Sequence, residues 1–255
     1  MENTNEDPCE ILPWDTTFWG FTIARVRDHS LTKENVRRID DWCAREFVRC
    51  LYFLSRPDDL CTTSLAENNG FHLVDVRVTL QYRAREKMLD QVIHPVNGII
   101  IRPARPKDVA VLQTIARDKY QCSRFYHDNN FPRDRCSALY ETWIKVSCEG
   151  YADLVLVAEL NGEAVGYITC HLDCGQPAGR IGLVAVDDRV QAMGVGRSLT
   201  IDALKWFQLR GVDDIFVVTQ GRNYPALYLY NRVGFAISSI QLWYHKWYTS
   251  GEVIR

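Results

Sequence analysis

The residues of this chain whose types and spacing could do chemistry begin in the stretch VAVDDRVQAMGVGRSLTIDALKWFQLRG, residues 184–211. An apolar run ends there in two glycines, Gly194 and Gly196, and residues that favour a helix follow at once. Glycine lets the backbone turn sharply and approach a ligand closely, and the free N–H groups of a helix start bind anions such as a pyrophosphate. The stretch therefore indicates either an ordinary strand–helix turn or an anion-binding loop.

A dinucleotide-binding loop does not fit this stretch. That motif reads GxGxxG soon after the first strand of a fold, with an acidic residue about 20 positions later. Here the spacing is QxxGxG from Gln191, and the motif lies late in the chain. The dinucleotide interpretation therefore fails.

A second segment, VVTQGRNYPALYLYNRVGF, places further polar groups on a predicted strand–helix–strand passage over residues 217–235. Asn223 opens the predicted helix, where a side-chain amide can cap the helix or contact a ligand. Tyr230 comes seven residues later, two turns along the same helix face. By itself Tyr230 could equally be a core residue with a satisfied hydroxyl.

Together, QAMGVG after VAV and the series Asn223, Tyr230 and Gly234-Phe235 resemble the GCN5-related N-acetyltransferase (GNAT) family over residues 99–248. The resemblance implies that Tyr230 is the general acid, which protonates the coenzyme A thiolate as the amine attacks the thioester. The family's usual Arg at the start of the loop is Gln191 here, an accepted variant. The residues that the resemblance assigns to acyl-CoA binding are Leu183, Val184, Val186, Gln191, Met193, Gly194, Val195, Gly196, Arg197, Ser198 and Asn223.

Other stretches concern the acceptor. SRF (123–125), ALYETWI (138–144), RIGLVAV (180–186) and WDTTFWGF (14–21) are similar to the branch of the family that acetylates the 4-amino group of a dTDP-linked amino sugar. The resemblance thus implies two small-molecule substrates, acetyl-CoA and a nucleotide-linked deoxyamino sugar used in surface-polysaccharide synthesis. Alternatives are a longer acyl group such as a hydroxybutanoyl, another small amine or a peptide N-terminus as acceptor, and a non-catalytic acyl-CoA-binding module. A homodimer is left open.

No single residue stands out as the general base. Four candidates lie on elements that would border the acceptor pocket: Glu141, Glu159, His171 and Asp173. Four aromatic residues could stack on a nucleotide base or pack in the core: Phe125, Tyr126, Tyr140 and Trp143.

Composition excludes several other classes of protein. The formal net charge of −2 over 255 residues and the lack of a dense basic block give no reason to expect a nucleic-acid partner. The start, MENTNEDPCE, does not resemble a secretory signal, and no apolar run approaches the ~20 residues needed to cross a bilayer. The nine cysteines fit free thiols in a reducing cytoplasm. Cys170, His171 and Cys174 lack a second ligand pair, so we expect no metal site.

The elements that must position these residues indicate a mixed α/β sheet with helices on its faces. We expect an N-terminal αβ domain at 1–84, a connector at 85–98 and the acyltransferase domain at 99–255. The first domain should contain strands around 18–27, 51–55 and 71–83 and helices at 32–49 and 62–69. The second should follow the order β-α-α-β-β-β-α-β-α-β-β, with a hairpin at Asn161-Gly162 and two final strands over 235–248.

A shift of 164 residues aligns the N-terminal half with the end of the chain in the order helix, strand, helix, Gly-Phe and strand. We therefore hypothesise that the first domain is a truncated, degenerate copy of the acetyltransferase fold, against the alternative of an unrelated small αβ domain. In this alignment Tyr230 corresponds to Ala66, and the glycine loop to Arg27–Thr32, which contains no glycine. One active site per chain is expected.

Overall fold

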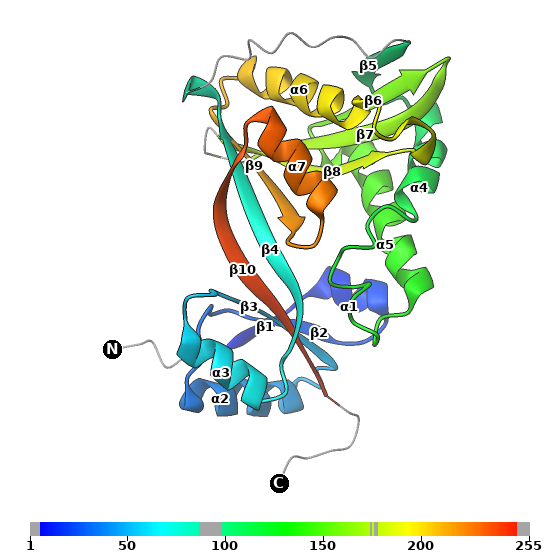
Figure 1. Cartoon of the computed structure of the whole chain (residues 1–255). Helices are drawn as coiled ribbons and strands as arrows, with labels where there is room; N and C mark the ends of the chain where they lie inside the picture. Colours follow the sequence, from blue (N-terminus) through cyan, green and yellow to red (C-terminus); the bar gives the residue numbers. More distant parts are fainter. Residues whose placement is uncertain (1–5, 87–97, 174, 176–177, 249–255) are drawn as a thin grey trace. The chain divides into compact units, whose positions relative to one another are not determined.

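The computed structural model describes residues 6–86, 98–173, 175 and 178–248, which divide into two compact units (Figure 1). The first unit comprises residues up to Arg77 and those from Ile240 onward, and the second comprises Val78–Ser239. These limits differ from the expected boundaries at 84 and 98, because the last strand pairs with a strand of the first unit. Most of the expected connector, and Cys174, lie outside the described residues.

The first unit has the strand order β1-β2-β3-β10. Strand β2 is parallel to β3, whereas β1 and β10 are antiparallel to their neighbours. The elements are β1 (Cys9–Ile11), α1 (Pro13–Trp19), β2 (Ile23–Val26), α2 (Lys33–Arg45), β3 (Cys50–Ser55), α3 (Leu60–Asn68), the first half of β4 (His72–Arg83) and most of β10 (Ala236–Trp247).

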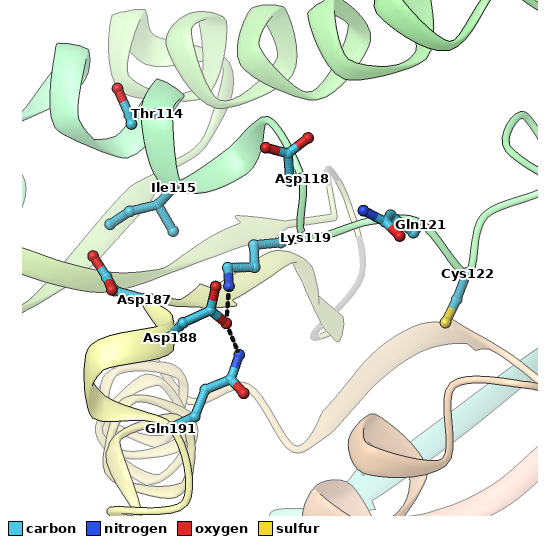
Figure 2. A pocket seen from close by; sticks show the side chains of 9 residues that line it. All are labelled: Thr114, Ile115, Asp118, Lys119, Gln121, Cys122, Asp187, Asp188 and Gln191. Atoms are coloured by element: carbon cyan, nitrogen blue, oxygen red, sulfur yellow. Dashed lines mark hydrogen bonds and ion pairs between the residues drawn. The ribbon is translucent and has the colours of Figure 1, made fainter.

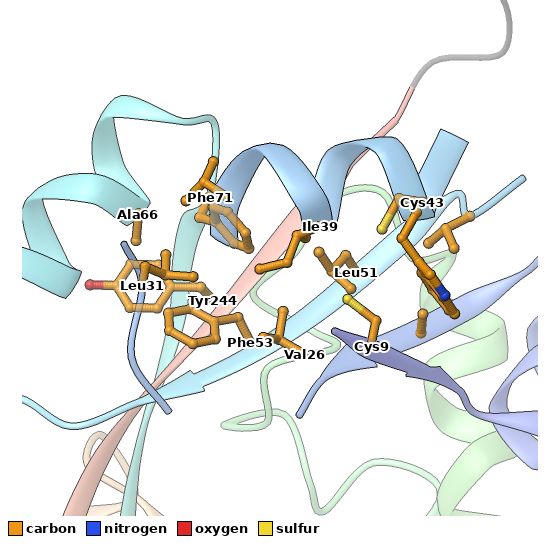
Figure 3. Close-up of a cluster of buried hydrophobic side chains, with 14 residues drawn as sticks. Cys9, Val26, Leu31, Ile39, Cys43, Leu51, Phe53, Ala66, Phe71 and Tyr244 are labelled. Atoms are coloured by element: carbon orange, nitrogen blue, oxygen red, sulfur yellow. The ribbon is translucent and has the colours of Figure 1, made fainter. Parts of the chain in front are cut away.

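Helix α2 covers the hydrophobic core of this unit (Figure 3). Its buried residues, among them Val36 and Ile39, recur at helical spacing and face Leu51 and Phe53 of β3. Thr32 caps the helix, since its hydroxyl accepts a hydrogen bond from the Asn35 N–H at 3.1 Å and its own N–H donates to the Asn35 side-chain oxygen at 2.7 Å. The start of α2 is therefore satisfied within the chain.

The second unit has the strand order β4-β9-β8-β7-β6-β5. Its strands β5 to β8 are antiparallel and β8 is parallel to β9, so the predicted mixed α/β sheet is confirmed. The elements are β5 (Ile99–Pro103), α4 (Val109–Ala116), α5 (Arg133–Val146), β6 (Leu154–Leu160), β7 (Glu163–Leu172), β8 (Ala178–Val186), α6 (Val195–Gln208), β9 (Asp214–Gln220) and α7 (Tyr224–Val233), with short 3₁₀ or π turns η2 (Pro106–Asp108), η3 (Ser147–Tyr151) and η4 (Asp188–Val190).

Helices cover both faces of this sheet. A side chain on Gly166 of β7 would meet Leu199 of α6, whereas the next residue, Tyr167, bonds to Tyr120 just after α4. Because successive side chains of a strand point to opposite faces, α6 and α4 lie on opposite sides of β7. A methyl group on Gly179 of β8 would collide with the Phe207 ring of α6, so this close approach requires glycine.

Most predicted elements are present, with two corrections. The Asn161-Gly162 hairpin is confirmed, with both residues at positive φ (52° and 86°), as a type I′ turn requires. The expected strand near 18–27 is instead α1 followed by β2, because Pro13 opens a short helix that ends at the left-handed Gly20. The two final strands are one, β10, since no glycine or proline interrupts Ala236–Trp247.

The two units share one internal order of elements. Strands β3 and β9 begin at Cys50 and Asp214, and β4 and β10 begin at His72 and Ala236, so each pair is 164 residues apart. Within its own unit, β3 pairs in parallel with β2 as β9 does with β8, and β1 is antiparallel to β2 as β7 is to β8. This agreement supports the duplication hypothesis beyond what the sequence alone offers.

Candidate active site

Strands β8 and β9 stop pairing before either of them ends. Their parallel register runs from Ala178↔Asp214 to Ile181↔Val217, whereas β8 continues to Val186 and β9 to Gln220. At the same level β8 has an irregular register with β7, and Leu183 N–H donates to Thr169 Oγ1 at 2.8 Å. In the described part of the chain, the backbone of β8 beyond Ile181 therefore has no strand partner on the β9 side, where an extended ligand could add its own hydrogen bonds.

The glycine loop connects β8 to α6 through an unusual backbone. Ala192 has a φ of 61° and Gly194 a φ of 86°, both in the left-handed region. Gly194 is the N-cap of the 14-residue helix α6 and has no side chain with which to bond the first N–H groups. These donors, together with the positive end of the helix dipole, remain available for an anion.

Ten of the eleven residues predicted to bind acyl-CoA lie on three consecutive segments. The end of β8 holds the half-buried Leu183, Val184 and Val186; the loop holds the exposed Gln191, Met193 and Gly194; and the first turn of α6 holds Val195, Gly196, Arg197 and Ser198. The last, Asn223, precedes α7. Since the side chains of Val195 and Ser198 are buried, these two residues could reach a ligand mainly through their backbone groups.

Asn223 caps α7, as one of its two predicted roles requires. Its side-chain oxygen accepts a hydrogen bond from the Ala226 N–H at 3.3 Å, and Pro225 stands in the first turn. The side-chain amide nitrogen makes no hydrogen bond to any other described residue. This nitrogen is therefore free to act as a donor to a ligand.

Tyr230, two turns further along α7, is a buried phenol whose hydroxyl bonds to no other described residue. Its ring packs edge-on against Phe235, with centroids 5.5 Å apart, and only 4% of the residue is exposed. Burial raises its pKa well above the ordinary value for tyrosine. The hydroxyl oxygen itself is not among the fully enclosed polar atoms without a partner, so a water molecule or a ligand atom can reach it.

Three other tyrosines form a cluster beside it. Tyr120 stacks on Tyr140 with centroids 4.2 Å apart, and its hydroxyl bonds to that of Tyr167 at 3.0 Å. Burial and the neighbouring phenols of Tyr167, Tyr140 and Tyr230 raise the pKa of Tyr120. All four phenols are therefore neutral at physiological pH.

The aromatic residues proposed for base stacking are mostly core residues. Phe125, Tyr126 and Tyr140 are buried; Phe125 packs edge-on against Phe131, and Tyr140 against Trp143. Core packing is thus the better explanation of these residues.

Three of the four candidate bases are engaged in ion pairs. Glu141 accepts from Arg117 at 2.6 Å, Glu159 from Arg102 at 2.5 Å, and Asp173 lies 3.5 Å from Arg180. Each of these carboxylates would have to give up its cationic partner before it could face the amine of an acceptor.

His171, the fourth candidate, is a buried imidazole on β7. Its Nε2 lies 3.3 Å from Thr169 Oγ1, and a side chain on Gly182 of β8 would collide with it. Burial, assisted by Arg180, lowers the pKa of His171. It is therefore neutral at pH 7 and able to accept a proton.

The buried imidazole should make the stability of the chain pH-dependent between pH 7 and 5. The unfolded chain binds a proton near the ordinary histidine pKa of about 6.5, whereas folded His171 binds it only at lower pH. The free energy of unfolding therefore falls as the pH drops, with a contribution of at most about 1.4 kcal/mol per pH unit. His127 is exposed, but partial desolvation and nearby arginines lower its pKa too, so it adds to this slope. The carboxylates with lowered pKa act only below about pH 4.

We expect His171→Asn to flatten this slope in urea titrations at pH 7, 6 and 5. The matched control is His72→Asn, since His72 is exposed on β4. An unchanged slope in His171→Asn would show that the imidazole titrates normally in the folded chain.

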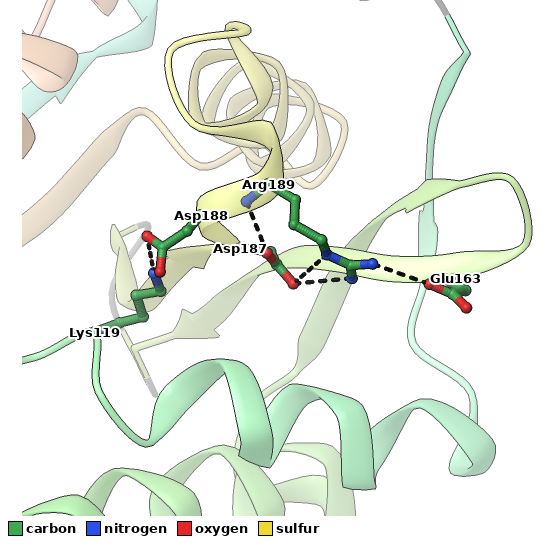
Figure 4. Close-up of polar contacts among 5 residues, drawn as sticks. All are labelled: Lys119, Glu163, Asp187, Asp188 and Arg189. Atoms are coloured by element: carbon green, nitrogen blue, oxygen red, sulfur yellow. Dashed lines mark hydrogen bonds and ion pairs between the residues drawn. The ribbon is translucent and has the colours of Figure 1, made fainter.

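A cavity of about 490 Å³ lies between the end of α4 and the start of the glycine loop (Figure 2). Lys119 bonds to Asp188 there, and the Gln191 side chain bonds to the same carboxylate. Asp187 is held by Arg189, which also reaches Glu163 at 3.4 Å (Figure 4). The sequence offered no signal for this cavity, because its two sides are almost 70 residues apart.

Comparisons with known proteins show what the chain is similar to in sequence and in fold. Residues 113–235 match the family model "Acetyltransferase (GNAT) family". The chain is 26% identical to the spore coat polysaccharide biosynthesis protein SpsD of Bacillus subtilis (strain 168), over 57% of this chain and 50% of that protein. It is 29% identical to the mycothiol acetyltransferase of Arthrobacter sp. (strain FB24), over 48% of this chain and 38% of that protein. The chain thus spans half or less of the length of these curated relatives.

Solved structures support the fold. A GCN5-related N-acetyltransferase from Sphaerobacter thermophilus superposes with a TM-score of 0.64 at 17% identity, over 94% of this chain and 76% of that one. A tandem GNAT protein from the clavulanic acid biosynthesis pathway gives 0.63 at 13% identity, over 90% and 76%. At such identities the likeness concerns the fold alone. Within the described residues, no helix is long and apolar enough to cross a bilayer.

Proposed function

Since residues 113–235 match the model of the acetyltransferase (GNAT) family, we propose that this chain transfers an acyl group from a coenzyme A thioester to an amine. The observation that supports this most directly is the separation of β8 from β9 next to an uncapped glycine loop, with the unpartnered phenol of Tyr230 on the helix that follows β9. An ordinary strand–helix turn would need neither the uncapped helix start nor the lone hydroxyl.

The residues present fit acyl-CoA. The N–H groups around Gly194 and the first turn of α6, with Gln191 and Met193 beside them, suit a diphosphate. The β8 backbone at Val184 and Val186, beyond the last residue paired with β9, suits the amide groups of the pantetheine arm, whereas the Leu183 N–H is already bonded to Thr169 Oγ1. The Asn223 amide nitrogen is a further donor.

Acetyl-CoA supplies an activated thioester, and the side chains of this chain handle the protons. Tyr230 donates a hydrogen bond to the leaving sulfur and transfers its proton as negative charge builds there. Its raised pKa keeps it protonated throughout the working pH range, so the donor is present in every molecule. A backbone N–H of β8 polarises the carbonyl oxygen, and His171, the one candidate base without an ion pair to a carboxylate or guanidinium, takes the amine proton.

For the acceptor we propose a nucleotide-linked deoxyamino sugar, as in TDP-fucosamine acetyltransferase, which this sequence resembles. The similarity to a spore coat polysaccharide biosynthesis protein supports a role in polysaccharide synthesis. The second candidate is another small amine, favoured by the several mycothiol acetyltransferases among the relatives. A non-catalytic acyl-CoA-binding module is less consistent with the free Tyr230 hydroxyl.

An acceptor screen tests the proposal. Purified chain would be incubated with acetyl-CoA and with dTDP- and UDP-linked 3- or 4-amino-6-deoxyhexoses, a small primary amine without a nucleotide and a peptide amine, and the release of thiol would be measured. We expect turnover with one class of nucleotide sugar. Turnover with the small amine alone would favour the second candidate. No turnover with any acceptor, together with retained acetyl-CoA binding, would point to a different donor or a binding module.

We also propose that only the second unit binds acyl-CoA. In the first unit the helix that corresponds to α6 is capped by Thr32. The cap that corresponds to Asn223 is Asp59, whose charge would repel phosphate, and Tyr230 corresponds to the buried Ala66. The degenerate copy has thus lost its donors, its neutral cap and its acid.

Calorimetric titration with coenzyme A should therefore give one site per chain. Gly194→Val should abolish this binding, because valine is strained at a φ of 86°, and a thermal melt would verify that the variant is folded. A second class of sites, or binding that survives in folded Gly194→Val, would contradict the proposal.

A further inference from the structure

The cavity beside the glycine loop contains a cation whose bonding is unusual for its surroundings. Of the nine described residues that line it, Lys119 is the one with a positive charge, and Asp118, Asp187 and Asp188 are negative. Asp187 is already paired with Arg189. Lys119 follows the end of α4, and only 19% of its side chain is exposed, so its ammonium is held at this position (Figure 2).

The contact that Lys119 makes is shared with the loop. Its Nζ and the Nε2 of Gln191 both donate to the same oxygen, Oδ1 of Asp188. Two donors on one oxygen lie within about 6 Å of each other. An ammonium from the segment after α4 and a primary amide from Gln191, the first residue of the glycine loop, thus converge on one anionic oxygen.

Asp188 is poorly suited to be the permanent partner of this pair. Its side chain is 79% exposed, and an ion pair with an exposed carboxylate contributes little to stability. An anion bound on the adjacent loop would repel Asp188 and attract Lys119. The carboxylate therefore occupies a position between the two donors where a phosphate oxygen would be bound more strongly.

We propose that Lys119 binds the diphosphate of coenzyme A, exchanging the Asp188 carboxylate for a phosphate oxygen. This inference rests on the proposed acyl-CoA site. It extends that site from the β8–α6 loop to the segment after α4, which also carries Tyr120 of the phenol cluster. The exchange makes Asp188 a competitor for the ligand, so the two members of one ion pair have opposite effects on affinity.

That opposition is the test. Coenzyme A binding would be measured by calorimetry for Lys119→Gln, Asp188→Asn and a control, Lys145→Gln, in which an exposed lysine of α5 is neutralised. We expect Lys119→Gln to raise the Kd about tenfold, Asp188→Asn to lower it, and the control to leave it unchanged. Pantetheine, which lacks the phosphates, should bind all four proteins equally.

Equal weakening in Lys119→Gln and Asp188→Asn would mean that the pair is merely structural and would overturn the inference. A loss of pantetheine affinity as large as that for coenzyme A would also overturn it. So would tighter coenzyme A binding by Lys119→Gln, which would mean that the ion pair holds the site closed against the ligand. If the unmodified chain does not bind coenzyme A, the proposed function itself falls. Unaltered affinity in Lys119→Gln would remove this inference alone.

Discussion

Tyr230→Phe is expected to lower kcat about 10²- to 10⁴-fold, the range typical of a lost general acid. The Kd for coenzyme A should change little, because the ring that packs against Phe235 is retained and the hydroxyl has no partner to lose among the described residues. Steady-state thiol release together with calorimetry measures both quantities. An interaction made only in the transition state lowers kcat in this way without weakening ground-state binding.

The control for this variant lies on the same helix. Tyr228 is exposed, and its hydroxyl accepts a hydrogen bond from Arg232 at 2.6 Å, so Tyr228→Phe removes an equivalent oxygen from α7 without touching the site. It should retain kcat. If Tyr230→Phe lost affinity in step with rate, Tyr230 would be a packing residue and another group would have to protonate the thiolate.

The pH profile adds an independent check on Tyr230. Since burial raises its pKa, it does not titrate between pH 6 and 9. The residual activity of Tyr230→Phe should therefore keep the same profile shape as the unmodified chain. A limb that disappeared in the variant would show that Tyr230 ionises within this range and that its environment is more polar than its burial indicates.

The parts of the site that could be predicted from the sequence are those whose structure depends on residues within a single segment, such as helix caps. The helix over Tyr224–Val233 is predicted at its observed limits, because Asn223 caps it and Gly234 ends it in the left-handed conformation. The pairing of β8 and β9 could not be predicted, since where two strands separate depends on packing and leaves no mark in either sequence. Lys119 could not be predicted as a site residue either, because its partner Asp188 is 69 residues away in the sequence.

Glu159 is a residue that the sequence suggested for the site but that the structure places in an ion pair. Its place on a strand near the expected acceptor pocket made it a candidate base, but nothing nearby in the sequence reveals that its partner is Arg102, 57 residues earlier. Arg102 also makes a two-point bond to Asp108, at 2.7 and 3.0 Å. Glu159 and Asp108 are therefore structural groups that pair with Arg102. Removing Arg102 should accordingly have a large effect on stability.

Arg102→Met should lower the free energy of unfolding by about 3–5 kcal/mol, the usual result of removing one partner from a buried ion pair. Arg102 and Asp108 are 9% and 5% exposed, so the substitution leaves two carboxylates without a counter-charge in a poorly hydrated place. Urea unfolding at pH 7 measures the loss. Arg117→Met is the matched control, because the Arg117 side chain is largely exposed where it pairs with Glu141, and its loss should be much smaller.

The sign of the pH dependence distinguishes this cause from a general loss of packing. Arg102 holds the pKa of Asp108 below its ordinary value, so Asp108 stabilises the folded chain above about pH 4 and this contribution is lost as the pH falls through the folded pKa. In Arg102→Met the unpaired carboxylates are instead relieved by protonation. The difference between variant and unmodified chain should therefore shrink toward pH 4, whereas a packing defect would leave it constant.

The ion pair also connects stability to the site. Asp108 accepts a hydrogen bond from the Arg105 N–H at 2.7 Å and stands directly before α4, so Arg102 fixes the start of the helix whose far end carries Lys119 and Tyr120. If the pair acts through this helix, Arg102→Met should weaken coenzyme A binding more than pantetheine binding at temperatures where the variant is still folded. If both ligands bind as before, Arg102 serves only to connect β5 to Glu159 of β6. The position of Lys119 is then determined by the residues that line the cavity.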